Sequence, residues 1–137
     1  MKLLLDTNIL LDVLMDREPF YELSQRIWNS CADKEFTGCI SSLSFANMVY
    51  HMRKTLTPEK IERLADRMSN IFNFVDLTVL DITQAAQMRW NDFEDALQSA
   101  AAERVKADYI ITRNVKDFEQ SNIKALTPED FLDLNYK

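Results

Sequence analysis

Short apolar runs alternate with longer segments of helical periodicity along this sequence of 137 residues. Residues 3–5 form one such run, and residues 109–112 form another, which is rich in the β-branched residues that favour buried strands. Between them, apolar residues recur every three or four positions, which is the spacing of amphipathic helices. Strands that alternate with helices form parallel sheets covered on both faces. We therefore expect one three-layer α/β/α domain over residues 1–137, with a central parallel sheet of four to five short strands.

Local signals predict the bounds of the other elements. Residues 57–59 and 127–129 both read Thr-Pro-Glu, which combines a capping residue, a proline at the first helical position and an acid in the first turn. A helix is therefore expected to begin at each of them. Further helices are expected over about 7–14, 20–33, 41–52, 83–89 and 92–106, with Thr83 as the cap of the 83–89 helix, and further strands over 36–40, 75–80 and 123–126.

The composition excludes several classes of protein. A single glycine, Gly38, cannot build a dinucleotide fingerprint or a P-loop. The apolar stretches are about half of the roughly 20 residues that a membrane span needs, and Asp6 follows closely on the N-terminus, so we expect a cytoplasmic protein. Cys31 and Cys39 have no zinc-binding spacing and are expected to be buried and reduced. The only histidine, His51, lies off the apolar face of its helix and is expected to be partly exposed.

Acidic residues stand where a parallel sheet presents its ligand-binding edge, beyond the carboxyl ends of the strands. Asp6 directly follows the first strand, and Asp117 lies a few residues after the strand that ends at Thr112. Asp92 and Asp95 open the helix that leads into that strand and share one helix face. If these two strands are neighbours, the four acids converge on one cleft.

A cluster of unpaired carboxylates is unfavourable by itself, because like charges raise one another's pKa. All-oxygen ligands favour Mg²⁺ or Mn²⁺ over zinc, and two such ions can activate a water for in-line attack on a phosphodiester. Each acid also has a purely structural use. Asp6 can cap the next helix, Asp92 and Asp95 can stabilise the start of theirs, and Asp117 can belong to a turn. Convergence favours the metal site, since capping does not require it.

Two segments of the sequence resemble the PIN-domain family. Residues 3–12, Leu-Leu-Leu-Asp-Thr-Asn-Ile-Leu-Leu-Asp, are similar to the opening of these proteins, and residues 95–102 with 107–118 are similar to their second half in order and spacing. The resemblance implies a Mg²⁺- or Mn²⁺-dependent ribonuclease, most often the toxin of a VapBC-type toxin–antitoxin pair. It implies Asp6 and Asp95 as metal-binding acids, with Asp92 adding to them or binding a metal through water. It further implies an RNA substrate, an antitoxin partner and a homodimer.

Two positions depart from the pattern of that family. Asn47 stands where these proteins usually have a glutamate, and Asn114 stands where many have an aspartate. An amide can ligate a metal or bind its water but adds no charge, so we expect a lower metal affinity than in a four-acid site. Asp117 is expected to compensate for Asn114, whereas nothing in the sequence replaces the charge missing at Asn47. Asn8 and Thr112 are expected as further supporting polar residues.

The net charge of −6 and the isoelectric point near 4.8 indicate that RNA is not held by the whole surface. Arg113, directly beyond a strand end, is the predicted contact for a substrate phosphate. The excess of acid also suits a basic antitoxin segment, whose arginine can pair with the carboxylates of the cleft.

Two other functions compete with the nuclease. A catalytically weak or inactive PIN-like module that binds RNA or protein is favoured by the amides at Asn47 and Asn114. A phosphoryl-accepting Asp6 would resemble haloacid-dehalogenase phosphatases or response-regulator receivers. The first have a second aspartate where Asn8 stands, and the second have an acidic pair where Asp6 stands alone, so neither pattern fits.

Overall fold

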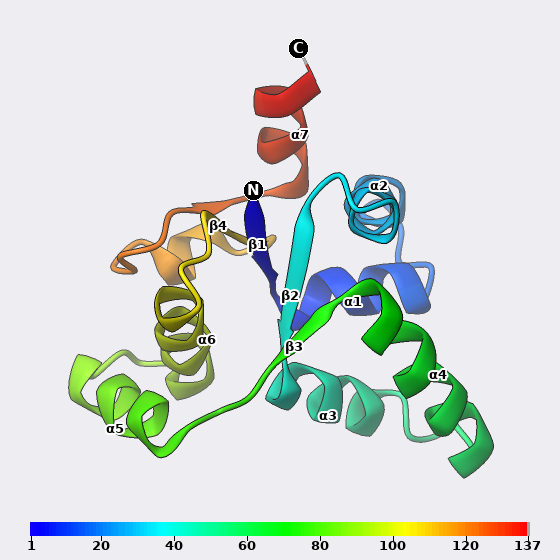
Figure 1. The fold of residues 1–137 in the computed structure, drawn as a ribbon, viewed down its shortest axis with the longest axis horizontal. Coiled ribbons are helices and arrows are strands. Elements are labelled where there is room, and N and C mark those ends of the chain that lie inside the picture. The colour runs from blue at the N-terminus through cyan, green and yellow to red at the C-terminus, as the bar shows by residue number, and fades with distance from the viewer. Residues whose placement is uncertain (137) are drawn as a thin grey trace.

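The computed structural model describes residues 1–136, and within them five parallel strands form one sheet in the order β3-β2-β1-β4-β5 (Figure 1). The strands are β1 (Lys2–Leu5), β2 (Thr37–Ser41), β3 (Asn73–Val75), β4 (Tyr109–Ile111) and β5 (Ala125–Leu126). The predicted class is confirmed, since helices cover both faces of this parallel sheet. β1 and β4, the strands that precede Asp6 and Thr112, are hydrogen-bonded neighbours with Leu5 opposite Ile111.

The helices follow the strands in the alternation that the sequence predicted. They are α1 (Thr7–Leu14), α2 (Tyr21–Ala32), α3 (Ser42–His51), α4 (Pro58–Ile71), α5 (Val79–Met88), α6 (Phe93–Arg104) and α7 (Pro128–Tyr136), with a short 3₁₀ helix η1 (Val115–Phe118). In Figure 1, α5 and α6 lie on one side of the sheet, and α1, α2 and α4 lie on the other.

The apolar core lies in two layers because alternate residues of a strand point to opposite faces. Leu3 and Leu5 of β1 pack with the apolar side chains of α1, α2, α4 and α7. Leu4, between them, packs on the opposite face with Ala101 and Ala102 of α6 and with Phe118 of η1. The small residues of α6 let this helix approach the sheet closely, which places its first turn near the end of β1.

Most helix starts agree with the capping residues predicted from sequence. The side chain of Thr57 accepts a hydrogen bond from Lys60 N at the start of α4, and Pro58 is the first residue of that helix. The side chain of Ser41 accepts one from Leu43 N at the start of α3. These caps satisfy backbone donors that the first turn of a helix leaves free.

The segment 75–80 differs from its prediction. The strand β3 lies at Asn73–Val75, and the next helix begins at Val79 instead of after Thr83. Thr78 caps that helix: its side chain accepts from Asp81 N, and its own N–H donates to the Asp81 carboxylate. The apolar residues Val79 and Leu80 suggested a buried strand, but they lie on the exposed face of α5. The reciprocal cap therefore decides the local structure here, and the hydrophobic pattern does not.

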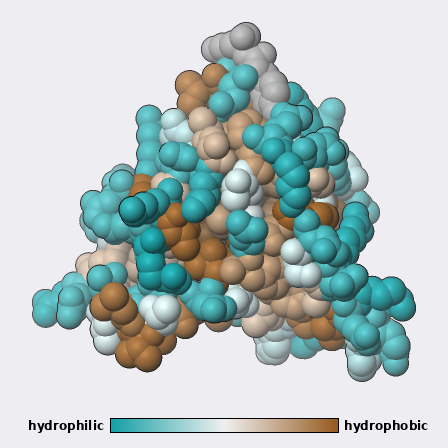
Figure 2. Space-filling view, in the orientation of Figure 1, coloured by the Kyte–Doolittle hydropathy of each residue, from teal (hydrophilic) through white to brown (hydrophobic). Residues whose placement is uncertain are grey.

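Exposed apolar residues gather on α5, where Val79, Leu80 and Ile82 are 77, 58 and 45% exposed. Figure 2 shows an apolar patch at this corner of the molecule, at the lower left of the view. An exposed apolar patch of this kind often marks a contact site for another protein. Cys31 and Cys39 are buried and unpaired, as predicted. Among the helices of residues 1–136, none is long and apolar enough to cross a membrane.

Candidate active site

Asp6 lies at the carboxyl end of β1, where the chain turns into α1. Its backbone N–H donates to Ile111 O at 2.9 Å, which extends the pairing of β1 with β4 by one residue. Its carboxylate accepts hydrogen bonds from Thr7 N at 2.8 Å and from Thr112 Oγ1 at 2.9 Å. Asp6 is only 9% exposed, and this burial raises its pKa, while the two hydrogen bonds oppose the increase. Two strand ends thus hold one buried carboxylate in a fixed orientation.

Asp92 and Asp95 come together in the first turn of α6. Asp92 is the capping residue, and its Oδ1 accepts a hydrogen bond from Asp95 N at 3.0 Å. The pKa of Asp95 is raised to about 7, chiefly because the carboxyl is partly buried. The next causes are the negative charges of its neighbours, in the order Asp92, Asp6, Asp117 and Glu94. The acids of β1, α6 and η1 are therefore close enough for their negative charges to add to the effect of burial.

These residues line one cleft of about 350 Å³, which we call the acidic cleft. It contains all four acids predicted from sequence, together with the predicted supporting residues Asn8, Asn47 and Asn114. The remaining lining residues are Thr7, Leu11, Tyr50, His51 and Glu94. Thr112 is fully buried behind Asp6, where its hydroxyl also accepts a hydrogen bond from Asn114 N at 3.0 Å. Residues from four distant parts of the chain therefore share a single concave surface.

Glu94 is an acid of the cleft that sequence reasoning did not assign. Asn47 Nδ2 donates a hydrogen bond to Glu94 Oε1 at 2.8 Å, and both side chains line the acidic cleft. A carboxylate of α6 thus stands next to the amide of α3 that replaces the usual acid. The sequence showed Glu94 between Asp92 and Asp95, but its pairing with Asn47 depends on how α3 and α6 meet.

A chain of hydroxyl and amide groups lies beneath the acids. Thr7 Oγ1 donates to Ser44 Oγ at 2.9 Å, and Gln98 Nε2 donates to the same oxygen at 2.7 Å. These bonds join α1, α3 and α6, the elements that carry Asp6, Asn47 and Asp95. Among the buried side-chain atoms of the described residues, Gln98 Oε1 is the one without a hydrogen-bond partner. These hydrogen bonds hold α1, α3 and α6, which form three walls of the cleft, at a fixed spacing.

Arg113 is not among the residues that line the acidic cleft in the described part of the chain. Its guanidinium forms two hydrogen bonds with Asp12, which is fully buried, and lies over the ring of Phe20 at 3.9 Å from the centroid. Its predicted contact with a substrate phosphate stays a prediction. His51, which was expected to be partly exposed, is exposed, and its Nε2 lies 2.9 Å from Arg17 Nη2.

The donor set of the acidic cleft matches a hard divalent cation in kind. Five carboxylates and three amides line it, and the ion pairs within residues 1–136 involve Asp12 and Asp81. None of the five acids is therefore in an ion pair, although the charge of Arg113 lowers the pKa of Asp6. The raised pKa of Asp95 is the expected response of a carboxyl that is partly buried and also surrounded by other acids. In the described chain no three acidic, histidine or cysteine side chains are already arranged around one point as ligands. A cation would therefore have to draw these carboxylates together.

Comparison with known proteins identifies the fold family. Residues 2–116 match the sequence model of the PIN domain. No curated protein matches the chain. Solved structures do match it, and one is a toxin–antitoxin complex from Klebsiella pneumoniae, with a TM-score of 0.71 and 23% identity over 91% of this chain and 96% of that one.

Two further solved structures resemble this chain over most of their length. VapBC2 from Rickettsia felis, bound to a DNA fragment from its promoter, has a TM-score of 0.68 and 19% identity over 93% of this chain and 98% of that one. VapC20 from Mycobacterium tuberculosis, a sarcin-ricin loop cleaving toxin, has a TM-score of 0.64 and 16% identity over 79% and 86%. The structures show a shared fold, and the sequence match over residues 2–116 shows that this chain belongs to the PIN domain family.

Proposed function

We propose that this protein is a Mg²⁺- or Mn²⁺-dependent endoribonuclease and the toxin of a VapBC-type toxin–antitoxin pair. The observation that carries the proposal is the convergence of Asp6, Asp92, Glu94, Asp95 and Asp117 on one cleft, where none of them forms an ion pair within the described residues. Helix capping accounts for Asp6 and Asp92 one at a time. It does not account for five acids on one cleft, where burial first and the charges of the other four acids second raise the pKa of Asp95 to about 7.

The residues of the chain divide the work of such a site. Asp6 is the most constrained acid, because Thr7 and Thr112 both donate to it and fix its orientation. Asp95 holds a proton part of the time near neutral pH and releases it when its neighbours are neutralised. Asp92, Asp117 and Glu94 complete the negative charge, and Asn47 orients Glu94. Bound divalent ions would supply an activated water and charge stabilisation for phosphodiester hydrolysis.

The proposed partners are an antitoxin and a second copy of this chain. Structures with this fold include toxin–antitoxin complexes, and the acidic cleft and the net charge of −6 suit a basic antitoxin segment. The exposed apolar residues of α5 offer a surface that a protein partner can cover.

A divalent-metal titration by calorimetry tests the proposal. The native chain is expected to bind Mg²⁺ and Mn²⁺ and to cleave RNA in their presence, and the double variant Asp6→Asn, Asp95→Asn is expected to lose both properties. The variant Asp66→Asn, which removes an exposed acid of α4, serves as the control and should retain them. A native chain that binds neither ion would overturn the two-metal mechanism.

A second candidate function is a PIN-like module that binds RNA or protein without cleaving it. The amides Asn47 and Asn114 in the acidic cleft favour it, as does the lack, within residues 1–136, of acidic side chains already arranged as ligands. The titration separates the two functions. RNA binding without metal binding or cleavage would identify the chain as this module.

A further inference from the structure

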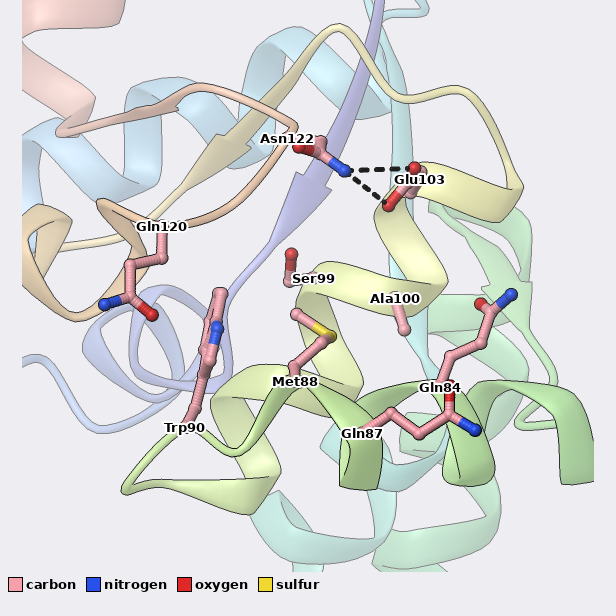
Figure 3. Close-up of a pocket in the computed structure, with 9 residues that line it drawn as sticks. All are labelled: Gln84, Gln87, Met88, Trp90, Ser99, Ala100, Glu103, Gln120 and Asn122. Carbon is pink, nitrogen blue, oxygen red and sulfur yellow. Dashed lines mark hydrogen bonds between the residues drawn. The ribbon is translucent and has the colours of Figure 1, made fainter.

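The acidic cleft is the first of three adjoining hollows. Asp92, Asp95 and Asp117 also line a second hollow, together with Arg89, Trp90, Lys116 and Gln120. Trp90 and Gln120 in turn line a third hollow of about 380 Å³, drawn in Figure 3, which we call the Trp90 groove. Because neighbouring hollows share lining residues, they form one continuous track that begins at the acids.

The Trp90 groove has the chemistry of a nucleobase site. Figure 3 shows the indole of Trp90 standing between Gln120 on one side and Met88 and Ser99 on the other. Phe118 contacts the indole in an edge-to-face arrangement with centroids 6.2 Å apart, which supports the ring from beneath. Aromatic side chains of this kind stack on unpaired bases.

Four amide side chains line the same groove, and Gln120 is the one beside the indole, while Gln84 and Gln87 lie beyond Met88. Gln84 and Gln87 come from α5, and Gln120 and Asn122 come from the segment after η1 (Figure 3). Each amide offers a donor and an acceptor, the pair of groups needed to read the edge of a base. Among the nine described residues that line the groove, Glu103 alone is charged, and it accepts from Asn122 Nδ2 at 3.3 Å through both oxygens. The groove therefore suits a neutral, flat and polar ligand.

The hollow between the acids and the groove holds two cationic side chains beside the acids Asp92, Asp95, Asp117 and Glu119. Arg89 and Lys116 line it, and the structure gives neither of them an ion pair within the described part of the chain. Arg89 ends α5 in a left-handed conformation with φ 58°, which turns the chain so that Trp90 follows directly at the groove. Arg89 and Lys116 lie between the acidic cleft and Trp90, where the sugar–phosphate backbone of a bound strand would pass.

We propose that the Trp90 groove binds one base of a single-stranded RNA, stacked on Trp90 and contacted by the amides of the groove, while the RNA backbone passes Arg89 and Lys116 to reach the acidic cleft. This inference rests on the proposed ribonuclease function and adds a specificity site to it. A base held in the groove places the scissile phosphate at a fixed distance along the strand, so the groove selects the sequence that is cleaved.

Tryptophan fluorescence provides a direct test, because the chain contains only Trp28 and Trp90. Trp28 is buried in the core, where it contacts Phe72, so the variant Trp28→Phe reports from Trp90 alone. The matched variant Trp90→Phe reports from Trp28 and is the control. Short homopolymers of A, U and C are mixed with each variant in millimolar Mg²⁺, and fluorescence is read at once. We expect quenching of Trp90 that differs between homopolymers, and none of Trp28.

Binding measurements support the spectroscopy without depending on the Trp28 variant. Trp90→Ala is expected to weaken binding of the preferred labelled homopolymer about tenfold by fluorescence anisotropy. Gln120→Ala, which removes the amide beside the indole, is expected to reduce the preference among homopolymers. Gln25→Ala, on α2 away from the groove, is the control and should bind as the native chain does. RNA that is bound and cleaved without quenching Trp90 would overturn the groove but leave the nuclease. RNA that neither binds nor is cleaved would overturn both.

Discussion

Arg113 forms two parallel hydrogen bonds with Asp12, 101 residues earlier in the chain: Nε donates to Oδ2 at 2.9 Å and Nη2 donates to Oδ1 at 3.1 Å. Ser24 Oγ donates to the same carboxylate at 3.2 Å, and Phe20 covers one face of the guanidinium. Asp12 is fully buried, which raises its pKa, and Arg113 is the main opposing charge. This pair fastens the end of β4 to α1, so it supports the two segments that present Thr112 and Asp6.

Removing the arginine should destabilise the fold. Arg113→Ala leaves the buried Asp12 carboxylate with only the Ser24 hydroxyl and a longer ion pair to Arg17 at 3.9 Å, and we expect a loss of about 3–5 kcal/mol in the free energy of unfolding. Urea denaturation measures it, with Arg63→Ala, at an exposed site on α4, as the control. The double variant Arg113→Ala, Asp12→Leu should recover part of the loss, because it removes the buried charge. A change below about 0.5 kcal/mol for Arg113→Ala would show that the pair has no such role.

The pH dependence of stability should depend on Asp95. Its folded pKa is about 7 and its ordinary value is 3.8, so between these two values the native state holds a proton that the unfolded state has lost. Stability from this residue is fully present below about pH 4 and declines as the pH rises to 7. Asn resembles the protonated acid. In EDTA and above pH 7, the free energy of unfolding of Asp95→Asn should therefore be about 1–2 kcal/mol larger than that of the native chain, after allowance for solvent screening.

Thermal unfolding at a series of pH values checks this expectation. The gain of Asp95→Asn should vanish at pH 4, and Asp66→Asn, at an exposed site on α4, should show no comparable gain at any pH. A variant that is less stable than the native chain at pH 7.5 would contradict the repulsion inferred for the cleft.

Much of the fold could be predicted because its signals are local. The apolar run before Asp6 and the Thr-Pro-Glu sequence at Thr57 determine a strand and a helix start within a few residues. The exception, α5, also had a local signal: Thr78 and Asp81 have the spacing of a capping box. The apolar residues of that helix favoured a strand instead, because a prediction from hydrophobic pattern treats apolar residues as buried.

The site was predictable only where the chain order sets the geometry. Asp6 and Thr112 follow neighbouring parallel strands, so their approach follows from topology. The contact of Asn47 with Glu94 depends on how two helices meet, and neighbouring sequence does not encode it. Trp90 is similar, since it enters a groove only because α5 ends there with a left-handed residue.

Thr112 should control the ionisation of Asp6. Thr112→Val removes the hydroxyl that donates to Asp6 Oδ2, so the pKa of Asp6, already raised by burial, should rise further. The substitution should also cost about 1–3 kcal/mol, because Asp6 and the Asn114 N–H lose a buried partner. Carboxyl NMR titration measures the pKa. Thr112→Ser keeps the hydroxyl and should leave it near the native value, and an equal shift in both variants would contradict the role of this bond.

Glu94 should supply the negative charge that Asn47 lacks. If the acidic cleft binds Mg²⁺, Glu94→Gln is expected to weaken binding about tenfold in a calorimetric titration, because it removes one of five carboxylates. Asn47→Ala should weaken binding less, by releasing Glu94 from its hydrogen bond, and the double variant should be no worse than Glu94→Gln alone. Glu59→Gln on α4 is the control. Additive losses would mean that Asn47 contacts the metal independently of Glu94, and an unchanged affinity in Glu94→Gln would exclude this acid from the site.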